Sequence, residues 1–219
     1  MQARRIIAIL ASFLVHSGTA DAQAAAAVGA PEITPPRAAA APADVVASAV
    51  AAVRDLGEQV ALGRFQVAVD RMNPMWKERA ARRAGGMEAL ERQLDGVARR
   101  MVQEGVSVIS SRPHGQPRSF EIWPGRRTVT VDGREFEEMT HTMWMVLVPT
   151  VTTYRILREG EQRPLMIEST GFQVAISDKS RLDWTFIDGT GLTVNELRSL
   201  FLTLPADLDL PPIERREVR

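Results

Sequence analysis

The chain has 219 residues, contains no cysteine, and balances 27 Lys and Arg against 27 Asp and Glu. The absence of cysteine excludes a disulfide scaffold, a thiol nucleophile and a thiolate metal site. A formal net charge of zero provides no overall field that would favour nucleic acid or an anionic membrane, so we expect neither as a partner.

Residues 1–24 have the layout of a secretory signal peptide. Arg4 and Arg5 form a basic start, residues 6–15 form a short apolar run, and Ala22-Gln23-Ala24 resembles a cleavage site. The run is shorter than the roughly 20 residues that span a bilayer, and no second candidate follows. We therefore predict cleavage after Ala24, a periplasmic or secreted protein without a membrane span, and an Ala/Pro-rich linker over residues 25–43.

Apolar residues at helical spacing predict helices in the first half of the domain, which we place at residues 44–212. Asp44 is the expected cap of the first helix, and Gly63 is its expected end. A short helix should follow before Asn73-Pro74, and a further helical turn should begin at Pro74. A long amphipathic helix is predicted from Met87 to Gly105.

Arginines are frequent on these predicted helices, at positions 79, 82, 83, 99 and 100. They could form a docking surface for an anionic partner. The interpretation that we favour is a solvated helix face, partly neutralised by neighbouring glutamates, because exposed arginines are ordinary on helices.

From residue 105 the apolar residues alternate, which predicts strands. The expected set begins around residues 106–108 and 120–123. A hairpin then joins 128–131 to 134–136 through Asp132-Gly133, and long strands cover 139–149 and 165–177, with a last strand over 182–188.

The chain then returns to helix. Thr193 and Glu196 have capping-box spacing and predict a short helix through Phe201. Residues 204–211 read as an apolar strap across the core, and residues 213–219 as a loose charged tail.

Helices followed by strands predict an α+β domain in which N-terminal helices pack on a strongly curved antiparallel sheet. Several segments also carry a resemblance to a known superfamily: Met72-Asn73-Pro74 with Trp76, Gly85-Gly86-Met87, residues 101–105, Val148-Pro149-Thr150, residues 184–189 and residues 204–211. In these segments the chain resembles secreted bacterial members of the nuclear-transport-factor-two-like, or cystatin-like, superfamily. The resemblance implies a cone-shaped roll and a homodimer formed through the sheet, and it carries over no catalytic residue and no cofactor.

Strand alternation nominates residues that could line the interior of such a cone. Glu168 is in phase with Phe172, and Asp188 is in phase with Phe186, so both carboxylates are expected to point inward, whereas either face could hold His141. In the catalytic interpretation, Glu168 or Asp188 would act as the base and His141 as its proton partner. Alternatively, Asp188 forms a turn, Glu168 forms an ion pair and His141 is an ordinary sheet histidine. The histidine spacing predicts no metal site.

Four further residues are candidates for the wall of a ligand pocket: Trp123, Met143, Trp144 and Tyr154. They could also simply fill the interface between helices and sheet. Our leading hypothesis is a non-catalytic exported domain that binds a small apolar ligand or an envelope partner. The alternative is an acid/base enzyme of lyase, isomerase or hydrolase type that uses Glu168, Asp188 and His141. Neither hypothesis needs a cofactor.

Overall fold

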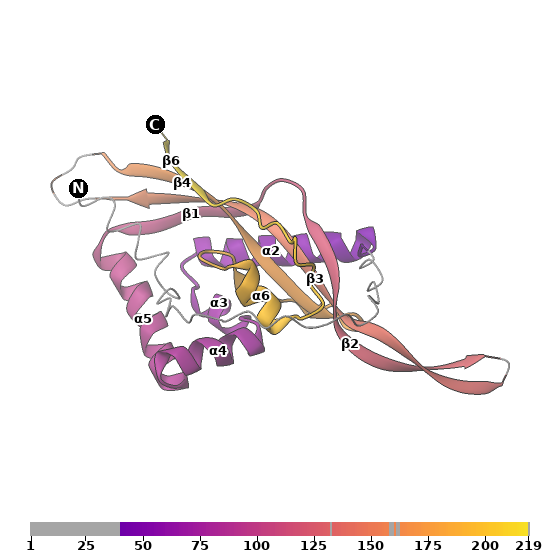
Figure 1. Ribbon diagram of the computed structural model, residues 1–219. Helices are drawn as coiled ribbons and strands as arrows, with labels where there is room; N and C mark the ends of the chain where they lie inside the picture. The colour runs from indigo at the N-terminus through magenta and orange to yellow at the C-terminus, as the bar shows by residue number, and fades with distance from the viewer. Residues whose placement is uncertain (1–39, 132, 158–159, 161–162, 219) are drawn as a thin grey trace, which may run out of the picture.

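The computed structural model describes residues 40–131, 133–157, 160 and 163–218. Within these residues the chain is α+β, with a six-stranded antiparallel sheet and helices packed against it (Figure 1). The predicted signal peptide, most of the linker and Asp132 of the predicted turn lie outside the described residues. None of the helices described is long and apolar enough to cross a membrane.

The helices predicted for the first half are present: α2 (Ala43–Ala61), α3 (Gln66–Asp70), α4 (Pro74–Ala84) and α5 (Met87–Gln103). Asn73 caps α4, because its Oδ1 accepts a hydrogen bond from the Trp76 amide at 3.3 Å. The prediction that Asp44 caps the first helix is wrong. The capping position is Pro42, which makes no side-chain cap bond, and its carbonyl accepts from the Val46 amide.

Six strands form the sheet: β1 (Val106–Pro113), β2 (Arg118–Val131), β3 (Arg134–Ile156), β4 (Leu165–Asp178), β5 (Thr185–Asp188) and β6 (Glu214–Val218). The strands predicted at 134–136 and 139–149 are one continuous strand, β3. Both β1 and β2 pair with β3, from Val106↔Ile156 to Pro113↔Thr150 and from Arg118↔Leu147 to Val131↔Arg134. On its other side β3 pairs with β4, to which both β5 and β6 are added.

The charged C-terminal tail that we predicted to be loose is largely the strand β6. Residues 214–218 pair with residues 166–170 of β4, and Arg216 lies opposite Glu168. An exposed sequence such as Glu-Arg-Arg-Glu-Val carries no apolar alternation. Its strand conformation therefore comes from the free edge of β4, which supplies unpaired backbone donors and acceptors.

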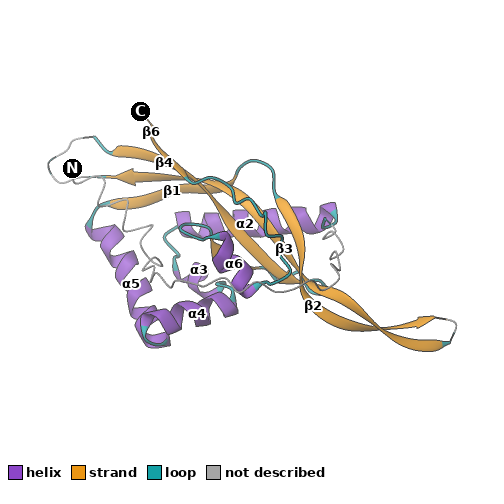
Figure 2. Cartoon of the chain, viewed as in Figure 1, coloured by secondary structure: helices purple, strands orange, loops and turns teal. Residues whose placement is uncertain are grey.

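β2 and β3 continue beyond the other strands as a two-stranded arm, which we define as residues 124–131 and 134–141. In this arm β2 and β3 pair only with each other, because the pairing of β3 with β4 begins at Met143. Figures 1 and 2 show the arm projecting from the body as a twisted ribbon.

The two faces of the sheet are covered by different helices. On one face α2 packs through Val45, Ala49 and Val53 against Val146 and Val148 of β3. On the other face α6 (Val194–Leu200) and residues 201–211 pack against the sheet. That second cluster is fully buried at its centre and contains Leu147, Val174, Ile187, Leu197 and Phe201. Because both faces of the sheet are buried here, residues 144–148 of β3 are all apolar and do not alternate with polar residues.

Candidate functional site

A cavity of about 750 Å³ lies between helices α2–α5 and the sheet. Its volume falls within the range of about 300–1,000 Å³ that is usual for small-molecule pockets. Residues from both halves of the chain line it, so neither the helices nor the strands form it alone.

The helical wall of the cavity is mainly apolar. Its large side chains are Val53, Leu56, Val60, Phe65, Val69, Met72, Trp76, Leu90, Leu94, Val97 and Met101. These residues recur at helical spacing, and the faces they form would normally be filled by a packed core. The apolar faces of α2 and α5 are therefore only partly used in contacts with the sheet.

The sheet wall of the same cavity is mainly polar. Its polar side chains on this face are Ser111, Thr150, Thr152, Tyr154, Ser169, Gln173 and Asp188, with Thr190 from the turn that follows β5. Even-numbered residues of β3 lie on this face: Val146 and Val148 are buried under α2, whereas Thr150, Thr152 and Tyr154 border the cavity. The change from valine to threonine along one face of one strand therefore marks where packing ends and the cavity begins.

The polar wall includes hydroxyl groups on adjacent strands. Ser111 Oγ on β1 lies 2.9 Å from Thr152 Oγ1 on β3. The backbone of Ser111 also sets how closely α2 approaches, since a Cβ at Gly57 would lie 2.2 Å from the Ser111 carbonyl oxygen. Gly57 therefore lets α2 lie directly on β1 at the edge of the cavity.

Tyr154 is the half-buried aromatic of the polar wall. Burial raises the pKa of Tyr154 to about 12, and the nearby Asp188 carboxylate adds to the rise, with Arg215 and Thr152 opposing it. The phenol therefore stays protonated at neutral pH and can donate a hydrogen bond to a molecule in the cavity.

Asp188 ends β5 opposite Gln173, and both residues line the cavity. Its Oδ1 accepts a hydrogen bond from the Thr190 amide at 2.9 Å, which is the turn contact expected of an Asp-Gly pair. Asp188 thus takes part in the turn and also presents its carboxylate to the cavity.

Glu168 points away from the cavity. It pairs with Thr153, and both lie on the sheet face opposite to Thr152 and Tyr154. Its Oε1 accepts from Arg216 Nε of β6 at 2.9 Å. This contact corresponds to the ion-pair alternative considered for Glu168, and the residue has no place in the cavity.

His141 lies at the base of the arm, opposite Pro124, with its Nδ1 3.9 Å from Glu121 Oε2. In register, Asp188 aligns with Val148 through Gln173, seven residues along β3 from His141. At about 3.3 Å per residue this separation is roughly 20 Å. The structure therefore does not bring Asp188, Glu168 and His141 together.

Of the four predicted wall residues, Tyr154 lines the cavity. Trp144 is buried beside α2, with Lys179 Nζ 4.2 Å from its ring centroid. Met143 packs against the core on the α6 side, and Trp123 is 44% exposed at the base of the arm.

Trp76 and Phe186 line the cavity as well. Neither is among the four wall residues predicted above, because alternation and helical spacing cannot tell a filled interface from a hollow one. The signal that could have predicted the cavity is the change from Val146 and Val148 to Thr150 and Thr152 along one face of β3.

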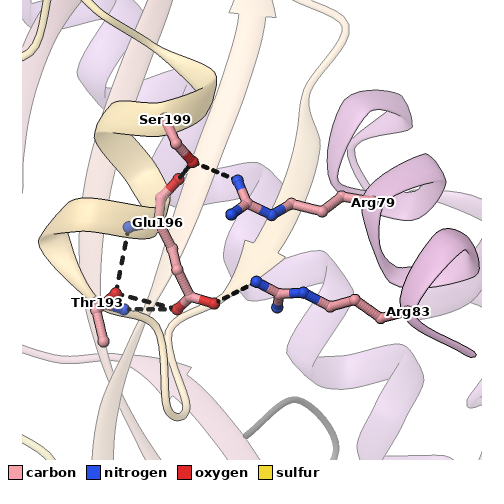
Figure 3. Close-up of polar contacts among 5 residues, drawn as sticks. All are labelled: Arg79, Arg83, Thr193, Glu196 and Ser199. Atoms are coloured by element: carbon pink, nitrogen blue, oxygen red, sulfur yellow. Dashed lines mark hydrogen bonds and ion pairs between the residues drawn. The ribbon is translucent and has the colours of Figure 1, made fainter. Parts of the chain in front are cut away.

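α4 is joined to α6 by a polar latch, which we define as Arg79, Arg83, Thr193, Glu196 and Ser199 (Figure 3). Arg83 Nη2 donates to Glu196 Oε1 at 2.9 Å, and Arg79 donates to the Ser199 hydroxyl. The predicted capping box is confirmed, because Thr193 Oγ1 accepts from the Glu196 amide while the Glu196 carboxylate accepts from the Thr193 amide.

Burial would by itself raise the pKa of Glu196, but hydrogen bonds from Arg83 and Thr193 and the Arg83 charge together lower it. The carboxylate therefore remains charged and holds α4 to α6 at neutral pH. Two of the arginines predicted as a possible docking surface, Arg79 and Arg83, thus have a structural partner.

No group of three or more His, Asp or Glu side chains suited to a metal ion occurs among the residues described. Comparison with known protein families, with curated proteins and with solved structures found no match to this chain. The function must therefore be inferred from the cavity itself.

Proposed function

We propose that this protein is a non-catalytic domain that binds a small, largely apolar molecule in the cavity between α2–α5 and the sheet. The observation that carries the proposal is the shape and chemistry of that cavity, about 750 Å³ with an apolar helical wall and a polar sheet wall. A cavity of this size in a packed domain forfeits apolar contacts unless a ligand fills it.

The two walls suit different parts of one molecule. The helical wall would remove apolar surface from water, at about 25 cal/mol per Å². The polar wall would fix the orientation, with the Tyr154 phenol as donor and the Asp188 carboxylate as acceptor. If the helices packed directly against this wall, we would expect apolar side chains in place of its hydroxyl groups.

Acid/base catalysis has less support. Within the described residues no histidine lines the cavity, and Glu168 lies on the other sheet face. Asp188 faces the cavity without a proton partner of suitable pKa beside it, since the pKa of Tyr154 is about 12. We therefore assign Asp188 and Tyr154 to binding.

We also propose that the domain is a nuclear-transport-factor-two-like roll and that it is exported. The order of helices and strands and the position of the cavity between them support the first proposal, and the layout of residues 1–24 supports the second. A homodimer through the sheet remains a prediction. N-terminal sequencing of the protein recovered from outside the cytoplasm should begin at Ala25, and an intact Met1 on that material would contradict export.

Binding can be tested with the neutral fluorescent probe N-phenylnaphthylamine and a variant that fills the cavity. Ala98 lines the cavity from α5, so Ala98→Trp should place an indole in the space and abolish the probe fluorescence. The control is Ala51→Trp, which adds the same side chain at an exposed position of α2 outside the cavity.

Loss of probe binding in Ala98→Trp, with binding retained in Ala51→Trp and circular dichroism unchanged in both, would support the proposal. Equal binding to the two variants would show that the probe sits elsewhere, and the cavity would then lose its role as the binding site.

A further inference from the structure

The polar groups of the cavity are spread along the sheet wall and are not gathered at one end. On β3 the wall side chains Thr150, Thr152 and Tyr154 lie on three successive rows of one sheet face. Gln173 on β4 lies on the row before them, opposite Val148. At about 3.3 Å per residue, these rows extend over roughly 20 Å. A molecule that lies along this wall therefore meets polar groups over its whole length.

One of these rows is polar across three strands. Ser111 on β1 and Ser169 on β4 both pair with Thr152 on β3, and all three residues line the cavity. Ser111 Oγ lies 2.9 Å from Thr152 Oγ1, so one of these hydroxyl groups donates to the other. Each hydroxyl has one O–H and two lone pairs, so one contact does not use up the pair. The row can therefore exchange further hydrogen bonds with hydroxyl or carbonyl oxygens of a bound molecule.

The charged side chains of the cavity are exposed, whereas the row across the three strands is uncharged. Among the described residues, Arg83 and Asp188 are the charged side chains that line the cavity, and both are exposed. Ser111, Thr152 and Ser169 are half-buried. A charged group placed against this row would lose part of its hydration without an opposite charge in the row to replace it. The row therefore favours an uncharged ligand.

The electrostatic field at Tyr154 has contributions of both signs. The Asp188 carboxylate raises the pKa of Tyr154 and the Arg215 charge lowers it, so the two effects partly cancel. The phenol itself is uncharged at neutral pH and is a hydrogen-bond donor. This end of the wall, like the row of hydroxyl groups, thus suits a neutral oxygen atom.

The helical wall is apolar along its length. It includes Leu56 and Val60 from α2, and Leu94, Val97 and Met101 from α5. These residues recur at about one turn of each helix, so apolar surface is not confined to one end. The cavity therefore has one apolar wall and one hydroxyl-bearing wall, and this differs from a pocket with a polar end and an apolar end.

We propose that the cavity takes an uncharged, facially amphiphilic molecule, a ring system whose hydroxyl or carbonyl oxygens lie on one face, against the sheet wall, and whose other face lies against α2 and α5. This inference rests on the proposed function and adds the charge and the polarity pattern of the ligand to it. A ring system holds its polar groups on one face in advance, whereas a flexible chain must be ordered on binding. A head-and-tail molecule would also leave most of the hydroxyl groups of the wall without partners.

The test compares two uncharged diols, methyl chenodeoxycholate and methyl ursodeoxycholate. They are epimers: the first carries both hydroxyl groups on one face of its ring system, and the second carries one on each face. Monodecanoylglycerol, which is uncharged and has a terminal polar head, is the third probe. Each is titrated against the full-length mature protein loaded with N-phenylnaphthylamine. We expect the first diol to displace the fluorophore at a concentration at least about tenfold lower than either other probe, because a hydrogen bond left unmade costs about one such factor.

The double variant Ser111→Ala with Thr152→Val removes both hydroxyl groups of the hydrogen-bonded pair, so neither is left without its partner. It should bring the two diols to within about threefold of each other, while N-phenylnaphthylamine still binds. The matched control is Ser110→Ala with Thr153→Val, which makes the same change at the neighbouring pair of the same strands, outside the cavity lining. The control should keep the preference for the first diol. Thermal unfolding of each variant checks that the fold is retained.

Equal displacement by the two diols, or displacement by neither, would overturn this inference and leave the proposed function standing. Stronger displacement by monodecanoylglycerol would also overturn it, as would a preference that survives the loss of the Ser111 and Thr152 hydroxyl groups. Failure of the fluorophore to bind at all, or its binding to Ala98→Trp, would instead refute the proposed function itself.

Discussion

The two faces of the sheet use the same strands in different ways. On the α6 face, Leu147, Val174 and Ile187 are completely buried against Leu197 and Phe201. On the α2 face the same strands pack as tightly at Val146, but farther along they border a cavity of about 750 Å³. The filled face provides stability, and the partly open face leaves room for a ligand, so a substitution should act differently on each.

The largest effect is expected from the filled face. Leu197→Ala removes a fully buried side chain from the α6 cluster and should lower the free energy of unfolding by about 3 kcal/mol. Denaturant unfolding followed by tryptophan fluorescence measures this loss. A cost below about 1 kcal/mol would show that the α6 face is no better packed than the cavity face.

The latch between α4 and α6 should have an intermediate effect that depends on pH. The lowered pKa of Glu196 means that its contribution to stability is complete above the ordinary Glu value of 4.5, and it is lost as the pH falls through the lower folded value. Glu196→Gln should therefore be less stable than the unmodified protein by about 1 kcal/mol at pH 7, and the difference should vanish in acid. A constant difference across this range would contradict the assigned ion pair.

Leu94→Ala, on the cavity wall, should cost less than Leu197→Ala. Leu94 is half-buried and already faces open space, so truncation removes few contacts and mainly enlarges an existing cavity. We expect a loss of about 1 kcal/mol or less in the same unfolding assay. A cost equal to that of Leu197→Ala would mean that the cavity is closed by packing in solution.

The smallest change is spectroscopic. Tyr154 is the single tyrosine of the chain, so tyrosinate absorbance in the near ultraviolet reports its ionisation alone. We expect a titration midpoint near 12 in the folded protein, against 10.0 for a free tyrosine, and a lower midpoint in Asp188→Asn because one cause of the rise is removed.

The sign of this shift also links Tyr154 to stability. A raised folded pKa stabilises the fold below the unfolded value, and this contribution is lost as the pH rises from about 10 toward 12. Tyr154→Phe should remove that part of the alkaline destabilisation. An ordinary midpoint near 10.0 would show that the phenol is open to water.

Local sequence signals predicted much of the fold. The start of α4 at Asn73-Pro74 and the capping box of Thr193 and Glu196 depend on contacts within a few residues, and both are confirmed. The cap of α2 was misplaced because Asp44 is acidic and near the helix start, yet the backbone of Pro42 already occupies the capping position. β6 was missed because the bonds that form it come from the distant strand β4.

The candidate site was harder to predict. Alternation placed Asp188 in phase with Phe186, and both line the cavity. The same rule also placed Glu168 inward, which is wrong, because alternation shows which residues share a face and not which face borders the cavity. It also could not measure the distance of His141 from the other two residues, since that distance depends on how far β3 extends as one strand.

By itself the sequence determined the types and order of the elements other than β6, the helix ends with local caps, and a chemistry free of thiols. Those features follow from side-chain size, periodicity and hydrogen bonds between near neighbours. The tertiary structure decided that α6 lies on the second face of the sheet, that the helices leave a cavity on the first, and that Asp188 and Tyr154 share it. The physical reason is that a void is a property of several elements packed together, and no single element encodes the space that its neighbours leave.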